Sequence, residues 1–302
     1  MSHYARQSNG PEKHDGMTAF SVRGWQTGDI PELREIFAAS FGDPPEVIDA
    51  FHRVFLTGPD CCAVAAVPDA ERPEGRAAAA GYLLPGPVLR FPDREDIPAA
   101  YLYALGCLPA FRRRGFGSAV YRALLGNGEK AGSTVCVLPA SEALVQSYGR
   151  IRPIRPLGGS RVAELESPRG TDAVPPAAER LSREEYALRR EECLAPYPHA
   201  AFPDSFYRLM DAYDNLFLSF PGALAAVVLL GNRCVVSELL CTHADPAGVI
   251  AGISGLCPAE RYVIRTPAFL PGPGEVRPFV YCHDPEGTLS LPDDFWFAFC
   301  LE

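Results

Sequence analysis

The sequence has no apolar run long enough to cross a membrane. None of its hydrophobic stretches approaches the roughly 18 uncharged residues that a spanning helix needs, and its first residues include no apolar core of a secretory signal. Hydrophobic residues still make up 47% of the chain and charged residues 22%, as in globular proteins with a sizeable core. We therefore expect a soluble, cytoplasmic protein with no membrane partner.

The sequence also lacks the cysteine and histidine patterns of metal sites. Its ten cysteines are scattered, no Cys-x-x-Cys pair occurs, and the six histidines stand apart from one another. Many of the cysteines fall in predicted strands or apolar segments, so we interpret them as buried small hydrophobic residues in a reducing compartment. No metal cofactor is expected.

The chain has fewer basic than acidic residues. The chain carries 28 Lys and Arg against 37 Asp and Glu, a net charge of −9, which argues against nucleic acid as the main partner. A cationic amine substrate would suit such a field, although solubility alone also favours this acidity. Three consecutive arginines at 112–114 are a local exception.

These arginines belong to a basic, glycine-containing turn between a predicted strand and a predicted helix. The turn, residues 112–117, reads Arg-Arg-Arg-Gly-Phe-Gly. Aromatic and aliphatic residues at 101–108 predict a largely buried strand before it. After it, Phe116, Val120 and Leu124 recur at helical spacing. The sequence thus places the turn at the start of a helix.

The start of a helix is a good place to bind an anion. Its first N–H groups have no partner within the helix, and the positive end of the helix dipole lies behind them. Gly115 and Gly117 let the main chain approach a ligand closely, and the arginines add positive charge. We expect a diphosphate here. The alternative is a solvated basic turn whose glycines serve only the bend.

Two common phosphate-binding motifs are absent from this turn. No Gly-Lys-Ser/Thr follows the glycines, which excludes a P-loop, and Val120 stands where a dinucleotide fingerprint needs its third glycine. The turn instead resembles motif A of the GNAT acyltransferase superfamily, Arg/Gln-x-x-Gly-x-Gly/Ala, and Pro109 supplies the proline that precedes it. Arg113 departs from the pattern, because the family most often has glycine there.

A second segment matches the same superfamily. Residues 135–138 predict a strand, and a helix opened near Ser141 reaches Tyr148. This resembles the family's strand-helix unit that ends in a tyrosine, with Ser141 where asparagine is common. The resemblance implies that Tyr148 protonates the departing thiolate; an interfacial tyrosine with a locally satisfied hydroxyl is the alternative.

The resemblance also implies a coenzyme A site. In that superfamily the loop holds the pyrophosphate, and the preceding strand splays open so that main-chain groups of Leu105 and Cys107 would pair with the pantetheine arm. The cofactor-binding residues expected on this basis are Leu105, Cys107, Arg112, Arg113, Arg114, Gly115, Phe116, Gly117, Ser118 and Ser141. Acetyl-CoA is the implied co-substrate.

The general base is missing from its usual place. Family members often carry a glutamate on the strand before the loop, but here strict alternation puts Tyr101, Tyr103, Leu105 and Cys107 on one face and Leu102, Ala104 and Gly106 on the other. Glu95 or Asp96, acting through water, and the terminal carboxylate after residues 295–301 are the remaining candidates.

The order of predicted elements indicates an α/β protein with two GNAT-like domains in tandem. We expect a flexible leader at 1–17, an acetyl-CoA-binding domain at 18–166, a linker at 167–176 and a degenerate second domain at 177–302. The first domain is expected to close with apolar segments that include residues 162–165. The second domain repeats the helix and strand order but has no basic glycine turn. The alternative interpretation of this half is an unrelated α+β module.

In the second half, Ser182 and Glu185 form a capping-box pattern that predicts the start of a helix. The function implied by the resemblance is transfer of an acetyl group from acetyl-CoA to a primary amine of a small molecule or peptide by direct attack. A coenzyme A-binding regulatory protein without turnover and an interaction protein without a nucleotide ligand are the alternatives.

Overall fold

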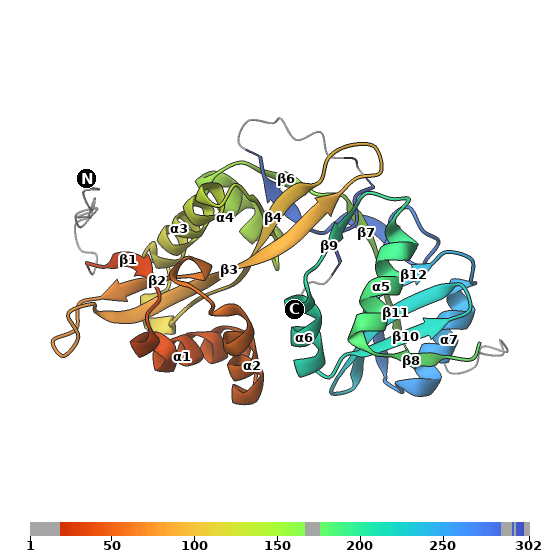
Figure 1. The fold of residues 1–302 in the computed structure, drawn as a ribbon. Coiled ribbons are helices and arrows are strands. Elements are labelled where there is room, and N and C mark those ends of the chain that lie inside the picture. Colours follow the sequence, from red (N-terminus) through yellow and green to blue (C-terminus); the bar gives the residue numbers. More distant parts are fainter. Residues whose placement is uncertain (1–18, 167–175, 285–291, 293, 299–302) are drawn as a thin grey trace.

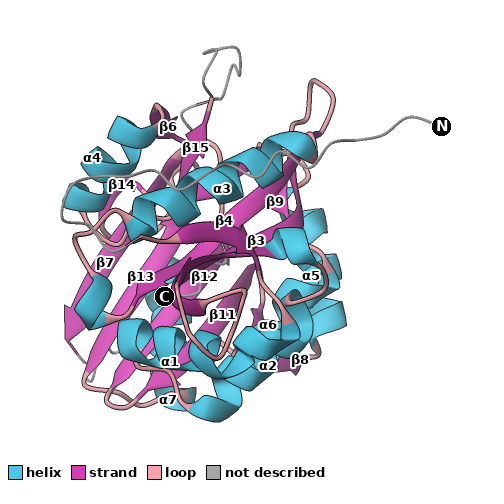
Figure 2. Cartoon of the chain, turned by 90° about the vertical axis from the view of Figure 1, so that its left-hand side faces the viewer, coloured by secondary structure: helices cyan, strands magenta, loops and turns pink. Residues whose placement is uncertain are grey.

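The computed structural model describes residues 19–166, 176–284, 292 and 294–298. Their strands form two mixed sheets that lie side by side, each with helices on both faces (Figure 1, Figure 2). The predicted leader lies outside the described residues, and so does the predicted linker except for Pro176. Among the described helices, none is both long enough and apolar enough to cross a membrane.

The first sheet holds the predicted anion-binding turn. Its strands follow the order β1 (Ser21–Gly24), β2 (Cys62–Val67), β3 (Arg76–Arg90), β4 (Ile97–Cys107), β5 (Thr134–Val137), β15 (Tyr281–His283) and β6 (Ile154–Pro156), and β9 (His199–Ala201) pairs with β3. Strands β4 and β5 run parallel, and the other neighbours are antiparallel.

Alternating side chains divide this sheet between two cores. Helix α3 (Phe116–Lys130) packs on one face, where it meets Ala100 and Leu102 of β4. Helices α1 (Ile30–Phe41) and α2 (Pro45–Phe55) pack on the other, where they meet Tyr101. Each face therefore buries alternate residues of the same strand, as the apolar sequence at 101–108 requires.

The second sheet follows the order β14 (Glu275–Pro278), β7 (Gly159–Glu166), β13 (Arg261–Pro267), β12 (Arg233–Cys241), β11 (Ala223–Leu230), β10 (Leu216–Phe220) and β8 (Glu179–Leu181). Helices α5 (Arg183–Leu194) and α6 (Asp204–Ala212) cover one face, and α7 (Pro246–Leu256) covers the other. The predicted capping box is confirmed: the Glu185 N–H donates to the Ser182 hydroxyl, and the Ser182 N–H donates to the Glu185 carboxylate.

Strands cross between the two halves of the chain. Strand β7, which contains the apolar segment expected to close the first domain, pairs with β13 and β14 in the second sheet. Strand β15, from the C-terminal part, lies between β5 and β6 in the first. The domain bounds 18–166 and 177–302 stay a prediction, and neither sheet is complete without chain from the other side of the linker.

A buried carboxylate on β12 (Arg233–Cys241) of the second sheet contacts α5 and the C-terminal segment. Glu238 on β12 and Arg190 on α5 are both fully buried, and Arg190 Nε lies 3.0 Å from Glu238 Oε2. The Tyr186 hydroxyl and the Trp296 indole N–H each donate to Glu238 over 2.6 Å. This carboxylate thus ties the C-terminal segment to the sheet and to α5.

We predict that Glu238→Gln destabilises the protein by about 3 kcal/mol, because it leaves the buried Arg190 cation to pair with the partly exposed Glu191. Urea unfolding followed by circular dichroism measures the change. Glu179→Gln is the matched control, because Glu179 pairs with Arg189 at an exposed site and its loss should cost less than about 1 kcal/mol. Equal losses in the two variants would contradict the prediction.

Candidate coenzyme-binding site

The end of β4 is bent by a bulge. Gly106 lies opposite Ala80 of β3 and Tyr103 opposite Tyr82, so two residues of β4, Ala104 and Leu105, face one residue of β3. Ala104 has a φ of 48°, in the left-handed region that residues other than glycine seldom occupy. An extra residue of this kind bends a strand and ends its regular pairing.

The bulge corrects the predicted faces of β4. Strict alternation placed Leu105 and Cys107 on the face of Tyr101 and Tyr103. In the structure both pack instead against the core under α3, and a Cβ on the neighbouring Gly81 would meet the Leu105 side chain. The alternation fails because the bulge shifts the register by one residue.

Strand β4 is also open along one edge. It pairs with β5 only from Ala99 to Leu102, opposite Thr134 to Val137. Beyond Leu102 the two strands part, and β4 keeps its pairing with β3 alone. The main-chain groups of Leu105 and Cys107 therefore lie where a ligand with amide groups could add to the edge.

Helix α3 begins without a side-chain cap. Its N-cap residue is Gly115, with a φ of 85°, and among the described residues no side chain accepts a hydrogen bond from its first turn. No acidic residue occupies that turn. Phe116 fixes the start of the helix, since its buried ring stacks on Phe20 with centroids 4.2 Å apart. The first N–H groups of α3 are thus available to an anion.

The three predicted arginines have different surroundings. The guanidinium of Arg112 donates to the carbonyl oxygens of Cys107, over 3.0 Å, and Ala39, over 3.3 Å, and so ties the end of β4 to α1. Arg113 is exposed and has a φ of 60°. Arg114 is exposed as well. Sequence alone did not reveal that Arg112 serves the main chain.

One pocket of about 260 Å³ joins these features. This α3 pocket is lined by Leu105, Gly106, Cys107, Phe111, Arg112, Arg113, Gly115, Phe116, Gly117, Ser118, Tyr121, Leu144, Ser147, Tyr148 and Ile151. Nine of the predicted site residues are among them. Arg114 is not, and neither is Ser141, whose hydroxyl instead caps α4 (Glu142–Ile151) by accepting from the Leu144 N–H over 3.4 Å.

Tyr148 lies in this pocket beside a second tyrosine. Its side chain is 8% exposed, and burial raises the pKa of Tyr148 to about 12. Its ring stacks on Tyr121 of α3 with centroids 4.4 Å apart and planes 10° from parallel. Tyr121 was not among the predicted site residues, although it directly follows Val120 in the predicted helix. Stacking fixes the plane in which the Tyr148 hydroxyl lies.

A histidine from β15 supports the tyrosine pair. The Tyr121 hydroxyl and Nε2 of His283 lie 2.6 Å apart, and both side chains are buried. Burial lowers the pKa of His283 to about 4, so the imidazole is neutral at physiological pH. No local sequence signal points to His283, because its partner lies 162 residues away.

Two of the proposed bases, Glu95 and Asp96, do not reach the pocket. Glu95 and Asp96 precede β4 and are exposed, and Asp96 lies 3.7 Å from Arg90. Leu105 lies nine residues after Asp96 and ten after Glu95, which corresponds to roughly 30 Å of extended strand at about 3.3 Å per residue. A bridging water cannot span that distance. The terminal carboxylate lies outside the described residues.

No family model matches the chain, and no curated protein matches it in sequence. Solved structures match it over most of its length. A GCN5-related N-acetyltransferase from Kribbella flavida is 15% identical with a TM-score of 0.61, over 87% of this chain and 70% of that one. A tandem GNAT protein of the clavulanic acid biosynthesis pathway is 11% identical with a TM-score of 0.54, over 89% and 99%.

The chain has the GNAT fold. The predicted class, α/β with two GNAT-like domains in tandem, is thereby confirmed. Saccharomyces cerevisiae N-myristoyltransferase with bound myristoyl-CoA is also similar, at 9% identity and a TM-score of 0.57 over 95% of this chain and 89% of that one. In this chain, residues that follow the predicted linker supply strand β15, and with it His283, to the first sheet.

We predict that His283 makes the protein acid-sensitive. Its pKa is about 4 in the folded state and 6.5 when unperturbed, so the unfolded chain takes up the proton first. Stability therefore falls as the pH drops from about 6.5 towards 4, by about 2 kcal/mol between pH 7 and pH 5. The His283→Gln variant should lack this part of the loss in unfolding free energy. Urea unfolding of wild type and variant at pH 7 and pH 5 measures it. An equal loss in wild type and variant would rule it out.

Proposed function

We propose that this protein transfers an acyl group, acetyl in the simplest case, from a coenzyme A thioester to a primary amine of a small molecule or peptide. The observation that supports this is the combination in one pocket of an open β4 edge, an uncapped helix start and a buried tyrosine hydroxyl. These suit the pantetheine amides, the diphosphate and the sulfur of one ligand. The similar structures include acetyltransferases and a protein with bound myristoyl-CoA.

The proposed contact with the diphosphate is electrostatic. The N–H groups at the start of α3 donate to phosphate oxygens, and the dipole of the helix favours the negative charge. Gly117 keeps this approach open, because a Cβ placed there would meet nothing within 4 Å in the protein itself. Arg113 at the rim adds a cation that the ligand can pair with.

The proposed chemistry at sulfur is proton donation without a covalent enzyme intermediate. Because its pKa is about 12, the Tyr148 hydroxyl keeps its proton at neutral pH and can donate it as the carbon–sulfur bond breaks. Cys107 also lines the pocket and could act as a nucleophile, but burial raises the pKa of its thiol. A thiol that stays protonated favours direct attack by the amine.

A second candidate function is coenzyme A binding without turnover. Among the described residues that line the α3 pocket, none is a carboxylate, so the amine has no adjacent base. Mixing the protein with acetyl-CoA and a panel of amines, and measuring the released thiol, separates the two functions. Amine-dependent thiol release supports the transferase; tight coenzyme A binding with no release supports the binding protein.

We predict that Gly117→Asp abolishes coenzyme A binding and leaves the fold intact. The aspartate adds a negative charge at the first turn of α3, where the diphosphate is proposed to bind, and there is open space for its side chain. Isothermal calorimetry with coenzyme A measures the affinity, and circular dichroism checks the fold.

Gly126→Asp is the matched control for this variant. Gly126 lies in the same helix, also with nothing within 4 Å of an added Cβ, but near its other end. The Gly126→Asp variant should bind coenzyme A with an affinity within about twofold of the wild-type value. Wild-type affinity in Gly117→Asp would refute the assignment of the helix start to the diphosphate.

We predict that Tyr148→Phe lowers kcat by about 10²-fold with little change in coenzyme A affinity, the usual contribution of a positioned general acid. The phenylalanine keeps the stack on Tyr121 and removes only the hydroxyl. Steady-state thiol release measures kcat. Tyr197→Phe, which alters a ring stacked on Phe269 against the second sheet, is the control. An unchanged kcat would remove Tyr148 from the mechanism.

A further inference from the structure

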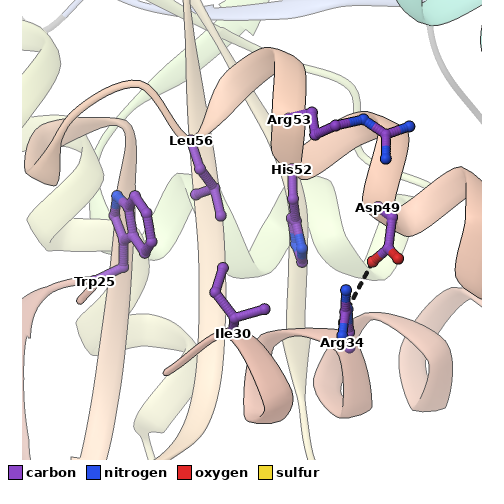
Figure 3. A pocket seen from close by; sticks show the side chains of 7 residues that line it. All are labelled: Trp25, Ile30, Arg34, Asp49, His52, Arg53 and Leu56. Atoms are coloured by element: carbon purple, nitrogen blue, oxygen red, sulfur yellow. Dashed lines mark hydrogen bonds and ion pairs between the residues drawn. The ribbon is translucent and has the colours of Figure 1, made fainter. Parts of the chain in front are cut away.

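A second pocket lies on the opposite side of the first sheet from the α3 pocket. It has a volume of about 290 Å³ and opens between α1 and α2 beside Trp25 (Figure 3). We call it the α1–α2 pocket. It shares no lining residue with the α3 pocket. Helix α1 rises about 15 Å between Ile30, which lines this pocket, and Ser40, which approaches Gly106 at the end of β4.

One wall of the α1–α2 pocket is apolar and held in place. It consists of the Trp25 indole and the side chains of Ile30 and Leu56, which lie on the same side of the opening in Figure 3. The Trp25 indole N–H donates to the Gly58 carbonyl over 2.8 Å, so the orientation of the ring is fixed. A half-exposed indole held this way offers a flat surface to an apolar ligand.

The other side of the pocket carries a surplus of one positive charge. Arg34 and Asp49 form an ion pair of 2.6 Å, and their charges cancel. Arg53, on the turn after Asp49, is exposed and forms no ion pair with the described part of the chain. The ligand that fits this side is therefore an anion with one charge.

A buried histidine with an unused nitrogen lies between the two sides. His52 is 7% exposed, and its Nε2 lies 2.8 Å from the Tyr82 hydroxyl of β3. Its Nδ1 has no hydrogen-bond partner among the described residues. When the Tyr82 hydroxyl donates to Nε2, the ring proton is on Nδ1, and a buried donor of this kind normally has an acceptor.

We propose that the α1–α2 pocket binds a small carboxylic acid with a flat apolar body. Its carboxylate pairs with Arg53 and accepts from His52, and its body packs between Trp25 and Leu56. The pocket is at the small end of the range for ligand sites, which selects a compound the size of a single aromatic ring with its acid group. The inference does not depend on the proposed acyl transfer, because the two pockets are separate.

The protonation of His52 should make the affinity for this ligand depend on pH. Burial lowers the pKa of His52 to about 4 in the free protein. The charged or titratable groups that face it are Arg34 on α1, Asp49 and Arg53 on α2 and Tyr82 on β3. An added carboxylate raises that pKa, so the complex binds more protons than the free protein. Binding is therefore tighter at pH 5.5 than at pH 7.5.

The test is a titration of the full chain with sodium benzoate, followed through the indole N–H resonance of Trp25. The chain has only two tryptophans, so Trp25→Phe assigns the resonance. We expect a Kd of about 1 mM, in line with the size of the ligand, and tighter binding at pH 5.5. Benzamide and benzylamine, the neutral and cationic analogues, should bind at least tenfold more weakly.

Arg53→Gln should weaken benzoate binding about tenfold, and Arg208→Gln, at an exposed arginine on α6, is the matched control that should leave it unchanged. Three results would overturn the proposal: no shift of the Trp25 resonance by 20-fold more benzoate than the expected Kd, equal shifts by all three probes, or wild-type affinity in Arg53→Gln. An affinity that does not rise between pH 7.5 and pH 5.5 would contradict the predicted rise of the His52 pKa in the complex. None of these outcomes bears on coenzyme A binding, which calorimetry tests separately.

Discussion

The geometry of the α3 pocket depends on one break in regular pairing, the bulge of β4 at Ala104 and Leu105. A strand that kept its alternation and its pairing with β5 would close the edge where we propose that a pantetheine arm binds, and would turn Leu105 and Cys107 towards α1. The bulge holds Ala104 at a positive φ, which costs of order 1 kcal/mol or more. Burial of the flanking residues between two helical layers offsets that cost.

The two halves of the chain depend on each other for both stability and the site. Strand β15 fills the gap between β5 and β6, and its His283 meets Tyr121 directly beneath the tyrosine that we propose as the acid. In return, β7 lies between β14 and β13 in the second sheet. The second half therefore has a structural reason to persist without a phosphate-binding turn of its own: the first sheet is incomplete without it.

Local signals in the sequence predicted most elements and the pocket's main-chain features. The basic turn, its glycines and the helical spacing after Phe116 predicted where α3 begins, and Ser182 with Glu185 predicted the start of α5. The bulge was not predictable, because Ala104 carries no residue-type signal for a positive φ. Neither was the contact of Tyr121 with His283, since strands of three residues such as β15 are selected by a distant edge rather than by their own composition.

The described residues that line the α3 pocket include no carboxylate, and this bears on which amine the proposed reaction would use. An alkylamine with a pKa of about 10.4 must lose a proton to water before it attacks, at a cost of about 4.6 kcal/mol at pH 7, whereas an α-amino group with a pKa near 8 pays only about 1 kcal/mol. After the attack, the nitrogen must release a second proton, and the departing sulfur must gain one. Tyr148 can donate its hydroxyl proton to the sulfur and be reprotonated by the proton that the nitrogen releases. If the proposed reaction takes place in a pocket whose described lining holds a proton donor and no carboxylate, α-amines should react faster than lysine-like amines.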